Sequence, residues 1–111
     1  PRRAAVLLVT SNRGLCGGFN ANLIKEARRR IEELEGAGYE AGLHVVGRKA
    51  AGYFKHIGRA MASQRQDIGD KPTVAHSFEL AQALISEFGA GKLASVDLVY
   101  ARFVSAMPAK R

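Results

Sequence analysis

The residues best suited to chemistry lie in one glycine-rich stretch, residues 10–20. It holds Arg13, the single cysteine Cys16, and glycines at positions 14, 17 and 18. An apolar run precedes the stretch and an amphipathic pattern follows it, so it is expected to form the turn of a βα unit. Backbone amides at such a turn are suited to an anion, and a thiol near a helix start and a cation is a candidate nucleophile.

The specific phosphate-binding patterns are not met by this loop. A Walker A motif requires Gly-Lys-Ser/Thr, and no lysine follows Gly17 or Gly18; the dinucleotide pattern G-x-G-x-x-G does not fit the glycine spacing either. The loop therefore resembles the glycine-rich turn of a Rossmann fold but lacks a phosphate-binding motif, and we expect no cofactor. No histidine or second cysteine adjoins Cys16, which favours a structural, buried or half-buried cysteine.

Other titratable residues form no catalytic pattern. The sequence has no zinc spacing, no G-x-S-x-G elbow and no H-E-x-x-H helix. His44 falls among apolar strand residues, where a hydrogen-bonded core histidine is the favoured interpretation. Three aspartates could approach one another at strand ends, but solvated turn carboxylates are the ordinary explanation for Asp67, Asp70 and Asp97.

Composition indicates one domain spanning residues 1–111. Domains of this size commonly have one core. No apolar run approaches the about 20 residues of a membrane span, and no signal-peptide core is present, so we expect a soluble domain. The net charge of +7, from 17 Lys and Arg against 10 Asp and Glu, favours acidic partners.

The elements that must position the loop alternate between strand and helix. The pattern predicts strands at 4–9, 43–46, 60–66 and 96–104, the third at a water-exposed edge and the fourth central. It predicts helices at 21–35, between Gly47 and Gly58, and from Thr73 to Gly89, with Asn20 and Thr73 as N-caps. This alternation implies an α/β fold: a Rossmann-like three-layer sandwich, with a mostly parallel sheet and helices on both faces.

Side-chain faces of these helices can be predicted too. The second helix should bury Ile57 among its apolar residues, and the third should bury Phe78. The first helix carries a solvated charged face, on which three pairs sit four residues apart. These pairs are Glu26 with Arg30, Arg28 with Glu32, and Arg29 with Glu33.

The stretch from Thr10 to Asn20, TSNRGLCGGFN, closely resembles the signature of the gamma subunit of F-type ATP synthases, usually written S-D-R-G-L-C-G. Further segments follow in the family's order: VGRK at 46–49, GDKPT at 69–73 and LVYARFVS at 98–105. Nearly the whole chain is covered. Asn12 stands where the family mostly has Asp, which removes a negative charge beside Arg13.

The resemblance implies the globular middle of a gamma subunit, a non-catalytic central-stalk part of the rotor. It implies as partners the beta and alpha subunits of the catalytic head, the epsilon subunit and the membrane rotor ring, with no nucleic acid and no direct membrane insertion. It implies a peripheral position on the cytoplasmic face of a bacterial plasma membrane, or the matrix or stromal face in an organelle. It places a contact with an acidic beta-subunit lever at Arg13, Gly14, Leu15, Cys16 and Gly17.

Two other classes fit parts of the sequence. A phosphate- or nucleotide-binding enzyme domain would use the amides of the loop together with a Lys or Arg near the anion. A basic nucleic-acid-binding module would need its cations on one face. Few aromatic residues lie between these cations in the sequence, which weakens this interpretation. The cations concerned are Arg2, Arg3, Arg13, Arg28, Arg48, Lys49 and Lys55.

Overall fold

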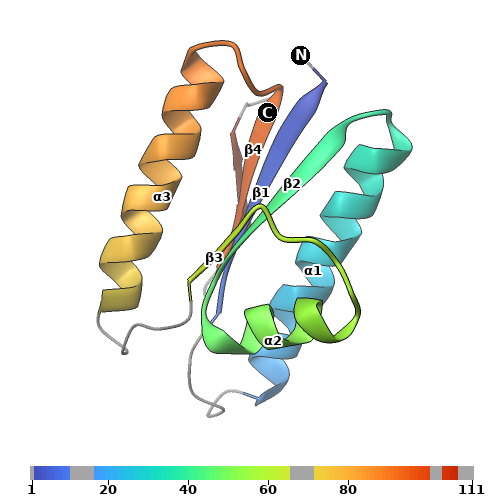
Figure 1. The fold of residues 1–111 in the computed structure, drawn as a ribbon, viewed down its shortest axis with the longest axis vertical. Helices are drawn as coiled ribbons and strands as arrows, with labels where there is room; N and C mark the ends of the chain where they lie inside the picture. The colour runs from blue at the N-terminus through green and yellow to red at the C-terminus, as the bar shows by residue number, and fades with distance from the viewer. Residues whose placement is uncertain (1, 11–16, 66–71, 101–103, 108–111) are drawn as a thin grey trace.

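The computed structural model describes residues 2–10, 17–65, 72–100 and 104–107 (Figure 1). Strands and helices alternate through most of this range, as the sequence predicts. The elements are β1 (Arg3–Val9), α1 (Gly17–Gly36), β2 (Glu40–Val46), α2 (Arg48–His56), β3 (Ser63–Arg65), α3 (Pro72–Gly89), β4 (Ser95–Val99) and β5 (Val104–Met107). None of the described helices is both long enough and apolar enough to cross a membrane.

The strands form one sheet in the order β3-β2-β1-β4-β5. Three of its pairings are parallel, and β4 pairs with β5 in the antiparallel sense. The predicted mostly parallel α/β sheet is thereby confirmed, and β3 does lie at an edge. Parallel neighbours joined through helices require long crossovers, which α1, α2 and α3 provide.

The single strand predicted over 96–104 is wrong. β4 ends at Val99, and the chain returns as β5, so that Val99 pairs with Val104. Residues rich in β-branched and aromatic side chains suit one long strand and the two arms of a hairpin equally well. Composition therefore predicts strand structure in this segment, but it does not predict that the chain reverses direction between β4 and β5.

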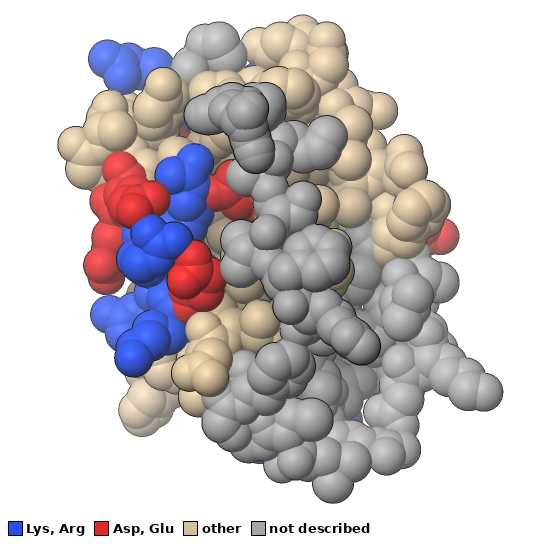
Figure 2. All heavy atoms as spheres, turned by 180° about the vertical axis from the view of Figure 1, so that it is seen from behind, with Lys and Arg blue, Asp and Glu red and all other residues tan. Residues whose placement is uncertain are grey.

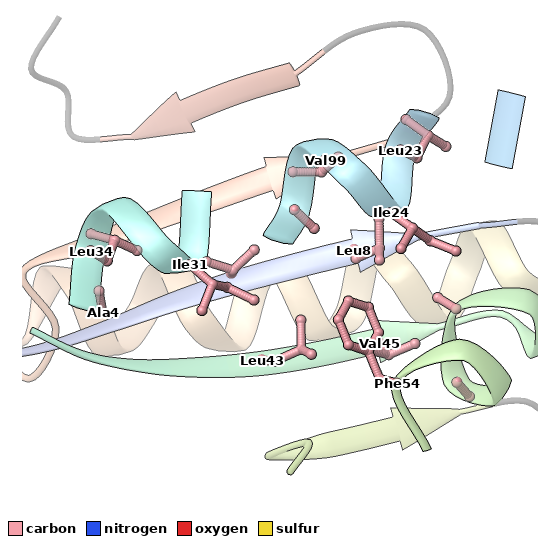
Figure 3. Close-up of a cluster of buried hydrophobic side chains, with 14 residues drawn as sticks. Ala4, Leu8, Leu23, Ile24, Ile31, Leu34, Leu43, Val45, Phe54 and Val99 are labelled. Carbon is pink, nitrogen blue, oxygen red and sulfur yellow. The ribbon is translucent and has the colours of Figure 1, made fainter. Parts of the chain in front are cut away.

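The face of the sheet under α1 and α2 carries the larger core. Fourteen of the described residues form one buried cluster, drawn from both helices and from β1, β2 and β4 (Figure 3). Phe54 of α2 is 1% exposed and is the largest side chain at the centre of this cluster. Successive strand residues point to opposite faces, so Leu43 and Val45 of β2 face these helices while His44 faces away.

The opposite face is covered by α3, so the helices lie on both faces as predicted. A second cluster joins Leu84 of α3 to residues of β1, β2 and β4. Two predictions of burial are wrong: Phe78 of α3 is 64% exposed, and Ile57 is 46% exposed because it follows the last residue of α2. An apolar residue is not buried when its helical position turns away from the sheet.

Two helices begin earlier than the capping rules predict. α1 starts at Gly17, which places Asn20 inside the helix, and α3 starts at Pro72, which places Thr73 inside it. Both N-cap assignments are therefore wrong. Proline suits the first turn of a helix, because its missing N–H has no intrahelical partner there.

Candidate functional site

The contact loop expected from the sequence leaves the sheet at the carboxyl end of β1. Arg13, Gly14, Leu15 and Cys16 lie outside the described residues, while Gly17 is the first residue of α1. The predicted contacts are therefore not tested. The structure does describe the framework on both sides of the loop, which fixes where the loop begins and ends.

Thr10 anchors the start of the loop to the junction between β2 and α2. It is 3% exposed, and its backbone N–H donates to the carbonyl of Val46 at 2.8 Å. Its Oγ1 accepts a hydrogen bond from the N–H of Ala50 at 3.1 Å. The hydroxyl thus satisfies one of the free donors at the start of α2, although Thr10 is distant from that helix in sequence.

Gly47 makes this junction possible by its close approach to Thr10. Its φ of 116° lies in the region that favours glycine. A Cβ built at this position would lie 2.1 Å from the carbonyl oxygen of Thr10, well inside contact distance. Only a residue without a side chain allows the end of β1 and the start of α2 to meet in this way.

The loop emerges where the order of the strands reverses. From β1, the chain moves through α1 to β2 on one side, and later through α3 to β4 on the other side. In open α/β sheets, ligands commonly bind at the carboxyl ends of the strands that flank such a reversal. The sequence of this loop contains neither of the two phosphate-binding motifs considered above. Among the described residues, no three His, Cys, Asp or Glu side chains are grouped to hold a metal ion.

The charged face of α1 forms most of its predicted ion pairs. Arg28 pairs with Glu32 at 3.6 Å, and Arg29 pairs with Glu33. The pair predicted between Glu26 and Arg30 is wrong, because Glu26 binds Arg29 instead. This hydrogen bond from Arg29 lowers the pKa of the Glu26 carboxyl. In Figure 2, acidic and basic side chains alternate over this surface.

Arg30 instead reaches across to the sheet. It bonds the carboxylate of Asp97 in β4 as well as Glu33, at 3.0 Å. Burial lowers the pKa of Arg30, but the hydrogen bonds that its guanidinium donates to these two carboxylates, together with their negative charges, outweigh burial and raise the pKa. The sequence did not predict this ion pair between α1 and β4.

The interpretation of Asp97 as a solvated turn carboxylate is wrong. Asp97 lies inside β4 and is 2% exposed, while Asp67 and Asp70 lie outside the described residues. A carboxylate within an apolar strand requires a cationic partner when that strand is buried. An aspartate within an apolar strand was therefore the sequence feature that could have indicated a buried ion pair, although it does not identify which arginine is the partner.

His44 is half-buried and hydrogen-bonded, as the sequence suggested. Its Nδ1 lies 2.9 Å from the Oγ of Ser63, and burial lowers the pKa of the ring although the charge of Glu87 opposes this. Together with Leu84 and Glu87, His44 lines a hollow of about 840 Å³ beside β2. Among the described residues, no hydrogen bond joins this ring to a carboxylate, which a Ser-His-Asp arrangement would require.

Of the cations weighed for nucleic-acid binding, Arg13 lies outside the described residues, and the others do not all lie at one end of the sheet. Arg2 lies at the amino end of β1 and donates to the carbonyl of Gly38 at 3.1 Å, whereas Arg48 and Lys49 follow the carboxyl end of β2, at the opposite end of the strands. Arg28 is engaged with α1 and α2 partners. The described cations therefore do not form one continuous strip.

Comparison with known proteins adds independent observations. A family model described as ATP synthase matches residues 1–110. The ATP synthase gamma chain of Gemmatimonas aurantiaca is 53% identical over 109 residues, covering 98% of this chain and 38% of that protein. The gamma chain of Frankia casuarinae is 39% identical over 109 residues, covering 95% of this chain and 37% of that protein.

Solved structures agree at the level of the fold. A chain in the Euglena gracilis mitochondrial ATP synthase matches with a TM-score of 0.54 and 17% identity, covering 96% of this chain and 35% of that one. The present chain spans less than two fifths of the relatives it matches. The family match extends over almost all of its residues, and the chain therefore belongs to the ATP synthase gamma chain family.

Proposed function

We propose that this chain is the globular part of the central rotor stalk of an F-type proton-translocating ATP synthase. In this function it performs no bond chemistry and couples rotation of the membrane ring to ATP synthesis or hydrolysis on the beta subunits. The observation that carries the proposal is the match to gamma chains along nearly the whole chain. The sequence of the loop, which matches neither the Walker A nor the dinucleotide-binding motif, is consistent with a non-catalytic role.

The proposed partners are the beta and alpha subunits of the catalytic head, the epsilon subunit and the membrane rotor ring. The proposed location is peripheral, on the side of the membrane that carries the catalytic head. That side is the cytoplasmic face of a bacterial plasma membrane, or the matrix or stromal face in an organelle. Such a position requires no membrane-spanning segment in this part of the protein.

Within this function, the loop from Arg13 to Gly17 would contact an acidic segment of a beta subunit. Two observations support this assignment: the resemblance of the loop to the family signature, and the hydrogen-bonded, closely packed junction from which the loop emerges. Thr10 and Gly47 tie the start of the loop to α2. A basic residue facing carboxylates in water makes a weak, salt-sensitive contact that permits sliding.

A chimeric gamma chain tests the proposed function. The corresponding segment of the Gemmatimonas aurantiaca gamma chain is replaced by this sequence, and the chimera is assembled with the other subunits of that synthase. We expect coupled ATP synthesis, with the parent gamma chain as the control. An assembled complex that hydrolyses ATP without coupling, or a saturable micromolar nucleotide site on the free chain, would contradict the proposal.

Two substitutions in the same chimera test the loop contact. Arg13→Glu should slow turnover or weaken assembly, with recovery as added salt screens the repulsion, whereas Arg13→Ala removes a surface pair worth about 0–1 kcal/mol. Thermal unfolding of both free variants is the control. A comparable large loss of stability in both would instead identify Arg13 as a residue that holds the loop together.

A further inference from the structure

The outward side of α2 carries positive charge without any acidic residue. Residues 41–66 include five Lys and Arg and no Asp or Glu. The exposed residues of α2 share one side of the helix, opposite buried Phe54, and we name them the cationic face of α2. They are Arg48, Lys49, Gly52, Lys55 and His56.

The position of these charges is unfavourable for the domain by itself. Arg48 and Lys49 occupy the first turn of α2, where the helix dipole is positive and where acidic residues are favoured. The cap residue Gly47 provides no side-chain hydrogen bond. Among the residues that the structure describes, Lys49 and Lys55 form no ion pair. The described ion pairs of the domain therefore leave the charges of Lys49 and Lys55 uncompensated.

Gly52 is a second feature that the domain itself does not require. It lies in the middle of α2, where glycine is less stable than alanine. A Cβ at this position would meet no atom within 4 Å, so neither the sheet nor α1 needs the space. An exposed glycine between cations allows another backbone to approach the helix closely.

The surroundings of this face favour a protein partner over nucleic acid or lipid. Of the two aromatic residues of α2, Phe54 is buried and the Tyr53 hydroxyl accepts a hydrogen bond from Arg28 at 2.9 Å. The Tyr53 ring is partly buried against the cluster under α1 and α2 and meets the Phe54 ring edge-on, so α2 offers no fully exposed aromatic ring of Phe or Tyr for the base stacking that single-stranded nucleic acids use. Ile57, 46% exposed, supplies one apolar contact beside the cations, which is too little for a membrane-inserting face.

We propose that the cationic face of α2 docks an acidic backbone segment of a neighbouring protein subunit, seated against Gly52. Asp or Glu side chains of that segment would pair with Lys49 and Lys55. They would also meet the positive end of α2, which opposes the charges of the face in the free domain. The inference rests on the proposed function, because it requires a multi-subunit complex around this chain.

Zero-length carbodiimide cross-linking tests the contact directly. The reagent joins a lysine amine to a carboxylate only when the two groups touch. In an assembled synthase containing the full-length gamma chain with this domain, we expect Lys49 or Lys55 to be joined to an Asp or Glu of another subunit. Mass spectrometry identifies the linked peptides, and Lys25 and Lys92, both exposed, serve as controls.

Charge reversal tests the contribution to assembly. The double variant Lys49→Glu with Lys55→Glu should weaken assembly of the gamma chain by about tenfold or more at low salt, with a smaller difference at high salt. The matched variant Lys25→Glu with Lys92→Glu should change it by less than about twofold. In the free gamma chain, Lys49→Glu should raise the unfolding temperature, because it places an acid at the start of α2.

Gly52→Ala separates docking from folding. In the free gamma chain it should raise the unfolding temperature by a few degrees, because alanine favours the helix. In the complex it should weaken assembly, because a methyl group enters the contact. Gly89→Ala is the control: Gly89 is the exposed last residue of α3, and a Cβ there also meets no atom within 4 Å.

Three outcomes would overturn the inference. The first is a coupled complex in which Lys49 and Lys55 cross-link no more than Lys25 and Lys92, and in which Gly52→Ala has no effect; the proposed function would then stand without this interface. The second is binding of the free chain to phosphatidylserine vesicles or to single-stranded DNA that depends on Lys49 and Lys55. The third is a wild-type chain that does not assemble at all, which would remove the proposed function as well.

Discussion

Helices α1 and α2 cover the same face of the sheet but distribute their charges in opposite ways. On α1, each of Arg28, Arg29 and Arg30 has a carboxylate partner, and one of these partners belongs to the sheet. On α2, the face turned away from the sheet has only positive charges. Both helices bury apolar residues in one shared cluster, so burial does not explain the difference.

The comparison separates what a helix needs for folding from what it offers to a partner. α1 is long, and ion pairs along it satisfy its charges locally. α2 has nine residues, too few to be stable by itself, and depends on Phe54, Gly47 and Thr10 for its position. Among the outer residues of α2, Lys49 and Lys55 take part in none of the described ion pairs, so no such pair ties them to the fold.

The largest effect should come from the junction that holds α2. Gly47→Ala places a Cβ 2.1 Å from the Thr10 carbonyl oxygen and requires a positive φ. Strain and overpacking of about 1–3 kcal/mol each give an expected loss of about 4 kcal/mol in unfolding free energy, measured by urea denaturation. Gly58→Ala is the control, because Gly58 has a positive φ but open space. Equal losses in both variants would show that the close approach does not matter.

The tertiary pair of α1 comes next. Arg30→Ala leaves the buried carboxylate of Asp97 without its cation and should cost about 3 kcal/mol, the lower end for such pairs because Arg30 is partly exposed. Asp97→Asn, compared in the same urea titrations, should cost less, since Arg30 can then reach water. A smaller loss in Arg30→Ala than in Asp97→Asn would contradict the assignment of Asp97 as the dependent partner.

Thr10→Val sharpens the comparison with little change in side-chain shape. It removes the Oγ1 that accepts from the N–H of Ala50 and should cost about 1 kcal/mol, the usual value of a helix cap. Hydrogen exchange should report faster opening in α2 than in α1. Uniformly faster exchange in both helices would indicate that the two fold as one unit and that this anchor is not specific to α2.

The smallest effect is expected for the exposed pairs of α1. Arg29→Ala should change the unfolding free energy by less than about 1 kcal/mol. Because Arg29 lowers the pKa of Glu26 in the folded state, the stability from this pair is present at neutral pH and is lost as pH falls through the acidic range. The variant should return the pKa of Glu26 toward its ordinary value, which NMR titration measures. An unchanged pKa would refute the pairing.

Local pattern predicted much of the fold, because many of its determinants are close in sequence. The apolar run of β1, the glycine-rich sequence after it and the helical spacing of apolar residues in α1 predict the first βα unit, and Gly47 and Gly58 mark the two ends of α2. The short edge strand β3 was recognised from its weak apolar bias. Each of these signals depends on a few neighbouring residues.

The parts that could not be predicted depend on contacts between distant residues. Arg30 and Asp97 are 67 positions apart, and nothing near either residue specifies the other. The hydroxyl of Thr10 acts on α2, 40 positions later. The loop contacts proposed for Arg13 to Gly17 stay predictions, because Arg13 to Cys16 lie outside the described residues.

The antiparallel return of β5 has a mechanical consequence. Ala4 of β1 lies beside Ser95 of β4, and Val96 of β4 lies beside Met107 of β5, so β1 begins and β5 ends at the same end of the strands (Figure 1). Two strand spacings, about 10 Å, separate these positions. A longer polypeptide can therefore hold this domain as an insertion, with the chain entering and leaving it at the same end of the strands. A pulling force or torque along that longer polypeptide is then not transmitted through the strands, so it does not stretch the sheet.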